Sequence, residues 1–169
     1  MAIKQSDIGL LLAPTYRSKA ILQVFQALDI TIRYAIILPD NEPVWHGDKN
    51  IDIPLSQHKK TINFEPTKTI ESSLEYADIS YSYAPTADVN TDEFINFIQN
   101  TAPSTYIYSG VAGCILRSDI INNSFKKFIH AHGGDAPRYS GSTAFYYSIL
   151  ECNLIGATVF WMDEGLHIS

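Results

Sequence analysis

Two histidines in the last quarter of the chain have the spacing of side chains that share one site. His130 and His132 follow the apolar pair Phe128-Ile129, which is typical of the interior of a β-strand. Alternate side chains of a strand project from the same face, so the two imidazoles are expected to lie side by side. Imidazole exchanges protons near neutral pH, and the pair is therefore suited to general acid–base catalysis.

A loop rich in glycine and proline follows this strand at once, between residues 133 and 141. Glycine and proline end regular structure and fix the shape of turns. Open α/β sheets place their ligands at the carboxyl ends of strands. The sequence therefore predicts a site where the strand with His130 and His132 gives way to the loop.

The elements that must position this strand alternate between strand and helix. Helical spacing of apolar residues predicts helices over 16–28, from residue 90 or 91 onward, over 117–123 and over 142–151. Apolar runs predict strands over 7–13, 31–38, 106–110, 127–132 and 157–162. Residues 40–90, which prolines interrupt, predict only loops and short elements. The alternation favours an α/β fold, a Rossmann-like parallel sheet flanked by helices, in a single domain over residues 1–169.

Composition narrows the function classes. The formal net charge is −6, with 12 basic and 18 acidic residues, and no basic stripe is present. This argues against nucleic acid as the main partner. Cys114 and Cys152 are isolated, so they are interpreted as small buried residues and no metal site is predicted. No segment is long enough to span a bilayer, which favours a cytoplasmic protein, and a homo-oligomer stays open.

The turn after the first strand lacks the glycines of a dinucleotide site. It reads Ala13-Pro14-Thr15-Tyr16-Arg17, without a Gly-x-Gly-x-x-Gly pattern. Without those glycines a pyrophosphate cannot approach the backbone closely, so a dinucleotide-dependent oxidoreductase is disfavoured. Arg17 and Arg138 could each hold a phosphate or a carboxylate, but a solvated arginine explains them equally well. Tyr146 and Tyr147 are expected to pack in the core.

Three spaced motifs in the last third of the chain resemble a known family. They are His132 with Pro137, Tyr139 and Gly141, then Gly156-x-Thr158, then Met162-Asp163-Glu164-Gly165-Leu166. This order resembles the catalytic domain of the folate-dependent formyltransferases, and the turn from Gly110 to Leu116 is similar to the folate loop of that family. The resemblance is specific over residues 106–167 and general over residues 7–100.

The resemblance implies transfer of a formyl group from 10-formyltetrahydrofolate to an amine. It assigns His132 to acid–base catalysis, His130 to the position of an Asn that stabilises an oxyanion, and His167 to the position of an Asp. An imidazole N–H at residue 130 could still donate to an oxyanion. The residues that the resemblance places at the folate are Gly110, Val111, Gly113, Cys114, Ile115 and Asp163.

Two further expectations depend on the resemblance. The family domain continues beyond the Asp position, so the fold is expected to be incomplete at its carboxyl end. The acidic composition favours a small amine acceptor, such as an amino-sugar nucleotide. Because residue 167 is not Asp, a catalytically silent domain that binds a ligand or pairs with another subunit is the alternative function.

Overall fold

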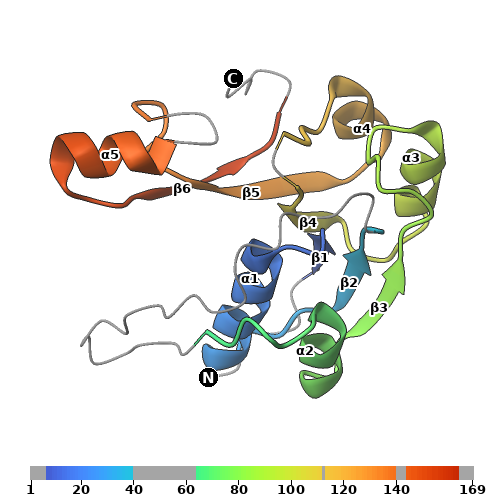
Figure 1. Cartoon of the computed structure of the whole chain (residues 1–169). Helices are drawn as coiled ribbons and strands as arrows, with labels where there is room; N and C mark the ends of the chain where they lie inside the picture. Colours follow the sequence, from blue (N-terminus) through green and yellow to red (C-terminus); the bar gives the residue numbers. More distant parts are fainter. Residues whose placement is uncertain (1–6, 40–63, 112, 140–143, 164–169) are drawn as a thin grey trace.

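The computed structural model describes residues 7–39, 64–111, 113–139 and 144–163, and it shows an α/β fold (Figure 1). Its elements are β1 (Ile8–Leu12), α1 (Tyr16–Ala27), β2 (Tyr34–Ile37), α2 (Ile70–Tyr76), β3 (Ser80–Tyr83), α3 (Asp92–Gln99), β4 (Thr105–Ser109), α4 (Ser118–Asn123), β5 (Lys127–Gly133), α5 (Ala144–Cys152) and β6 (Ala157–Trp161). The strands form one six-stranded sheet in the order β3-β2-β1-β4-β5-β6. All neighbouring pairs from β3 to β5 are parallel, which confirms the predicted fold class.

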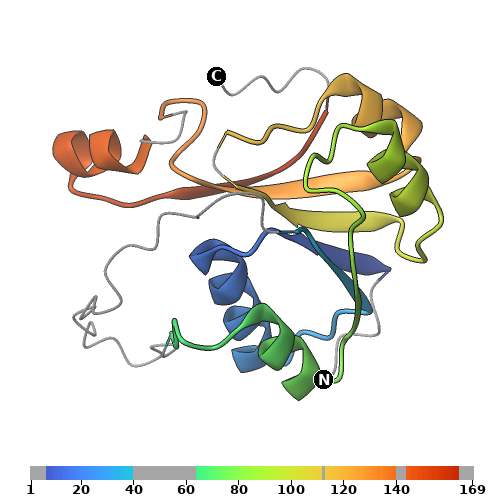
Figure 2. The same ribbon diagram turned by 45° about the vertical axis from the view of Figure 1, so that its right-hand side comes forward.

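Helices cover the two faces of the sheet and bury two separate sets of side chains. On one face α1 and α2 pack against Leu10 and Leu12, and on the other α3 and α4 pack against Leu11, Tyr106 and Phe128 (Figure 2). Because side chains alternate along a strand, His130 and His132 lie on the same face as Phe128. The histidines therefore belong to the face that α3 and α4 cover.

Three helices begin at threonine N-caps. The hydroxyl groups of Thr15, Thr69 and Thr91 accept hydrogen bonds from backbone N–H groups three residues later, which satisfies donors that the helix leaves free. Of the two predicted starts for α3, Thr91 is the cap. The side chain of Asn90 instead forms hydrogen bonds with the backbone of Ile115 and Arg117.

Residues 40–90, where only loops and short elements were predicted, contain α2 and β3, whose positions the sequence did not predict. β3 reads Ser-Tyr-Ser-Tyr, and both of its end residues are exposed. It is the edge strand of the sheet, so it needs no run of apolar residues to be stable in this position. β2 is also shorter than predicted, since pairing begins at Tyr34.

The last strand departs from the predicted parallel arrangement, because β6 runs antiparallel to β5. The cause is the position of α5, which stands beyond the carboxyl end of β5 and does not cross a sheet face (Figures 1 and 2). The chain therefore re-enters the sheet where β5 ends, with Ala157 opposite Gly133.

The same position of α5 changes the environment of several side chains. Tyr146 and Tyr147 are 57 % and 58 % exposed, so the expectation that they pack in the core was wrong. Cys152 is exposed, so the interpretation of this residue as a small buried one was wrong. Cys114 is half-buried, and both are free thiols. Across the described ranges no helix has the length and apolar content needed to cross a membrane.

Candidate functional site

The two histidines lie together at the carboxyl end of β5. In the register of the sheet His130 is opposite Tyr108 of β4, and His132 is opposite Thr158 of β6. Their ring centroids are 6.3 Å apart. The His130 ring also contacts the aromatic rings of Tyr108 and Phe160, at centroid distances of 6.2 and 5.7 Å. The shared face that the alternation predicts is confirmed.

A backbone hydrogen bond fixes the protonation pattern of His130. Its Nδ1 lies 3.1 Å from the backbone carbonyl oxygen of Tyr108. A carbonyl oxygen can only accept, so Nδ1 carries the hydrogen, and in the neutral ring Nε2 holds the lone pair. Burial is the main cause that lowers the pKa of His130, and the positive charge of Arg17 and the neighbouring His132 lower it further. The hydrogen bond to Tyr108 acts in the opposite direction.

His132 differs from His130 in the hydrogen bonding of its ring. Its Nε2 is buried, and it is the one buried side-chain nitrogen or oxygen that has no hydrogen-bond partner within the described part of the chain. Gly134 lies against it, because a Cβ built on Gly134 would be 3.4 Å from Nε2 and 2.9 Å from the Cβ of Ala144. A buried polar atom without a partner is uncommon in folded proteins and marks a place where water or a ligand group is needed.

Thr158 holds the loop that covers His132. Its hydroxyl group donates to the carbonyl oxygen of Gly134 at 2.8 Å and accepts from the backbone N–H of Ala136 at 2.9 Å. Gly156 lies directly against the same loop, since a Cβ there would be 3.3 Å from the Cβ of Asp135. The Gly156-x-Thr158 motif therefore has a structural role in this chain, which is to position the segment after β5.

The glycine-containing loop after β4 is anchored by Tyr108. The buried Tyr108 hydroxyl group donates to the backbone carbonyl of Cys114 at 2.9 Å, and burial raises the pKa of Tyr108 far above its ordinary value. A Cβ built on Gly110 would stand only 2.1 Å from that hydroxyl oxygen. Glycine is therefore required at residue 110 by the Tyr108 ring. Tyr108 connects this loop to His130, and the sequence motifs gave no sign of it.

The outer part of the loop presents apolar side chains beside backbone groups. Val111 and Ile115 are 43 % and 50 % exposed. Asn90 fixes the far end of the loop, because its side-chain amide donates to the carbonyl of Ile115 at 3.0 Å and accepts from the N–H of Arg117 at 2.7 Å. Gly113 has a φ of +81°, a conformation that glycine adopts without strain. Exposed apolar side chains on a fixed backbone are a feature of surfaces that contact an apolar ligand group.

Arg17 joins the start of α1 to the end of β4. Its guanidinium group donates to the carbonyl oxygen of Gly110 and lies 3.4 Å from the hydroxyl oxygen of Ser109. β1 and β4 are neighbours in the sheet, and the strand order reverses between them. Ligands of open α/β sheets bind at such a switch point. Arg138, by contrast, is exposed and 3.7 Å from the carboxylate of Glu151.

The structure does not bring every predicted residue to this place. The backbone N–H of Met162 donates to the carbonyl of Phe128 at 2.8 Å. Because β6 is antiparallel, Asp163 follows opposite the beginning of β5, whereas His132 is near its end. Asp163 is therefore apart from both described histidines. His167 lies outside the described residues, and the described ranges contain no group of three His, Cys, Asp or Glu side chains that could hold a metal ion.

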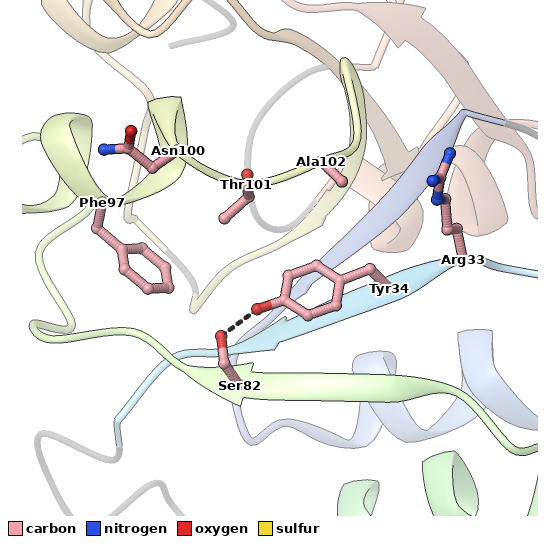
Figure 3. A pocket seen from close by; sticks show the side chains of 7 residues that line it. All are labelled: Arg33, Tyr34, Ser82, Phe97, Asn100, Thr101 and Ala102. Carbon is pink, nitrogen blue, oxygen red and sulfur yellow. Dashed lines mark hydrogen bonds between the residues drawn. The ribbon is translucent and has the colours of Figure 1, made fainter.

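A cavity of about 450 Å³ lies at the other end of the sheet (Figure 3). It is lined by residues at the start of β2, in β3, and between α3 and β4: Arg33, Tyr34, Ser82, Phe97, Asn100, Thr101 and Ala102. Tyr34 donates a hydrogen bond to Ser82 across it, with 2.5 Å between the oxygens. None of the predicted site residues lines this cavity.

No family model and no curated protein matches the sequence. Solved structures do match. Phosphoribosylglycinamide formyltransferase from Anaplasma phagocytophilum has a TM-score of 0.58 at 12 % identity, over 94 % of this chain and 65 % of that chain. Glycinamide ribonucleotide transformylase 1 from Symbiobacterium toebii has a TM-score of 0.55 at 16 % identity, over 95 % of this chain and 67 % of that chain. Phosphoribosylglycinamide formyltransferase from Brucella melitensis has a TM-score of 0.56 at 13 % identity, over 92 % of this chain and 72 % of that chain. The chain has the formyltransferase fold, and it spans 65 % of the length of the Anaplasma enzyme.

Proposed function

We propose that this protein transfers a formyl group from 10-formyltetrahydrofolate to an amine acceptor. One observation carries the proposal. Two adjacent imidazoles lie at the carboxyl end of β5, beside a glycine-containing loop that Tyr108 anchors, in a chain with the formyltransferase fold. The pair lies next to the switch point of the sheet, where this class of fold binds ligands.

The loop after β4 is the proposed binding site for the donor. Val111 and Ile115 would contact the apolar faces of the pterin, and the backbone around Gly110 and Gly113 would supply hydrogen bonds to its polar edge. The donor supplies an electrophilic formyl carbon when it is bound. Asp163 is not included, because the antiparallel β6 carries it to the other end of β5.

The acceptor must lose a proton as its nitrogen becomes an amide, and a neutral imidazole near pH 7 is suited to take it. Negative charge that develops on the formyl oxygen needs a fixed N–H donor. The two imidazoles place both kinds of group within one small region. We propose a small amine acceptor such as an amino-sugar nucleotide, because the chain carries a net charge of −6 and no basic stripe for a nucleic acid.

The first test is binding of 5-formyltetrahydrofolate, a stable donor analogue, measured by titration calorimetry. Saturable binding is expected, with a weaker constant for a His132→Ala variant of unchanged circular dichroism. Formation of tetrahydrofolate from 10-formyltetrahydrofolate would then be followed with a panel of amino-sugar nucleotides and simple amines. A folded protein that binds no reduced folate would remove the basis of the proposal.

A further inference from the structure

The two imidazoles are not equivalent, and the difference decides which of them can accept a proton. From the geometry we infer that His130 Nε2 is the group that takes the proton from the attacking amine. This inference rests on the proposed function and assigns a role that the sequence resemblance does not give, since the resemblance places an oxyanion donor at residue 130.

The tautomer of His130 decides which of its ring nitrogens can accept a proton. Nδ1 of His130 is committed as a donor to the carbonyl oxygen of Tyr108, at 3.1 Å. Nε2 of the neutral ring then carries a lone pair and no hydrogen. Such a nitrogen can accept a proton, but it cannot donate a hydrogen bond to an oxyanion. The oxyanion role would require a charged His130.

The surroundings of His130 disfavour the charged form of its ring. Among the described residues, the side chains that face the ring are Tyr108 from β4, His132 from β5 and Phe160 from β6, and Arg17 lies near it at the start of α1. None of these groups is an acid that would be negative near pH 7. Burial, the cation of Arg17 and the second imidazole all lower the pKa of His130, so the ring is neutral at physiological pH.

The two rings also differ at Nε2, although both histidines are half-buried as whole residues. The Nε2 atom of His132 is buried, and Gly134 lies against it. For an acceptor amine to reach this atom, the segment that Thr158 holds beside it would have to move.

The amine nitrogen forms a bond to the formyl carbon, the carbonyl π pair moves to the formyl oxygen, and one proton of the amine passes to His130 Nε2. When the oxygen pair returns, the bond between the formyl carbon and N10 of the donor breaks, and N10 receives the proton from the His130 imidazolium. The products are the formamide and tetrahydrofolate, and His130 is neutral again.

The decisive variant is His130→Asn, which installs the side chain that an oxyanion donor would have. If His130 accepts the proton, this variant loses roughly 100- to 10,000-fold in kcat, and the acidic limb of the profile of kcat/KM against pH disappears. In wild type that limb is expected to titrate below pH 6.5. His132→Asn is the matched control, and it keeps the limb even if its rate is lower. Full activity and an unchanged limb in His130→Asn would overturn the assignment.

A second measurement does not depend on turnover. Long-range ¹H–¹⁵N NMR of the full chain with labelled histidine reports which ring nitrogen carries the hydrogen, and His130→Gln identifies the signal. A neutral Nδ1–H ring is expected at pH 7.5, and an Nε2–H ring would overturn the inference in an active enzyme. Wild-type protein without any formyl transfer would instead overturn the proposed function, and the catalytic assignment with it.

Discussion

The ring of Tyr108 stands where a side chain on residue 110 would have to be, because a Cβ on Gly110 would lie 2.1 Å from the Tyr108 hydroxyl oxygen. Glycine is therefore required at residue 110 by a contact within the protein, with the ring of Tyr108. The proposed donor loop and the proposed base therefore share Tyr108, whose side chain donates to the loop and whose backbone carbonyl accepts from His130.

Gly110→Ala is expected to destabilise the protein by about 1–3 kcal/mol, since the methyl group would force the Tyr108 ring out of its place. Urea unfolding measures the change. Gly133→Ala is the matched control, because no atom lies within 4 Å of a Cβ at that position. Equal stability of the two variants would contradict the contact.

Tyr108→Phe is expected to weaken binding of 5-formyltetrahydrofolate and to lower the free energy of unfolding by about 1 kcal/mol, since the Cys114 carbonyl loses its donor. Tyr106→Phe removes a similar hydrogen bond, from a buried strand tyrosine to Thr101 at 2.7 Å, far from the loop. Its stability should fall by a comparable amount while folate binding stays unchanged. A comparable loss of folate affinity in both variants would refute the anchoring role of Tyr108.

Thr158→Val keeps the shape of the side chain but removes both hydrogen bonds that hold the loop over His132. A loss of about 1–3 kcal/mol is expected, because the N–H of Ala136 and the carbonyl of Gly134 lose their partner. Thr158→Ser retains the hydroxyl group and should recover most of this loss. The comparison is made by thermal and urea unfolding, and a Ser variant as unstable as the Val variant would argue against the hydrogen bonds.

The lowered pKa of His130 predicts a pH-dependent contribution to stability. In the unfolded chain His130 binds a proton near pH 6.5, whereas in the folded protein it does so only at lower pH. The unfolded state therefore binds more protons within this window, and the folded state loses stability as the pH falls from about 7 through 6.5 toward the folded pKa. The free energy of unfolding of wild type minus that of His130→Gln should decrease over the same range. A difference that does not vary with pH would show that the pKa of His130 is not lowered.

Much of the fold could be predicted from the sequence because apolar runs and helical spacing are strong signals. The run over residues 7–13 became β1, and the helical spacing over 16–28 became α1. β3 escaped prediction because an edge strand of Ser and Tyr buries little. The direction of β6 could not be predicted either. A five-residue strand has the same alternation in both directions, and the position of α5 decides which way the chain returns.

Less of the candidate site than of the fold could be predicted from the sequence. The spacing of His130 and His132 predicted their shared face correctly. The tautomer of His130 depends on a carbonyl group 22 residues earlier, which strand pairing alone brings into reach. Tyr108 was missed because a tyrosine within an apolar strand looks like any core residue.

The hydrogen bond that orients His130 comes from the main chain of residue 108 and not from a side chain. Every amino acid carries that carbonyl group, so no substitution at residue 108 can delete the acceptor as long as β4 and β5 remain paired. Substitutions at residue 108 could change the loop while the orientation of His130 is kept. If the loop binds the donor and His130 takes the proton, as proposed, the two functions can evolve separately although both depend on residue 108.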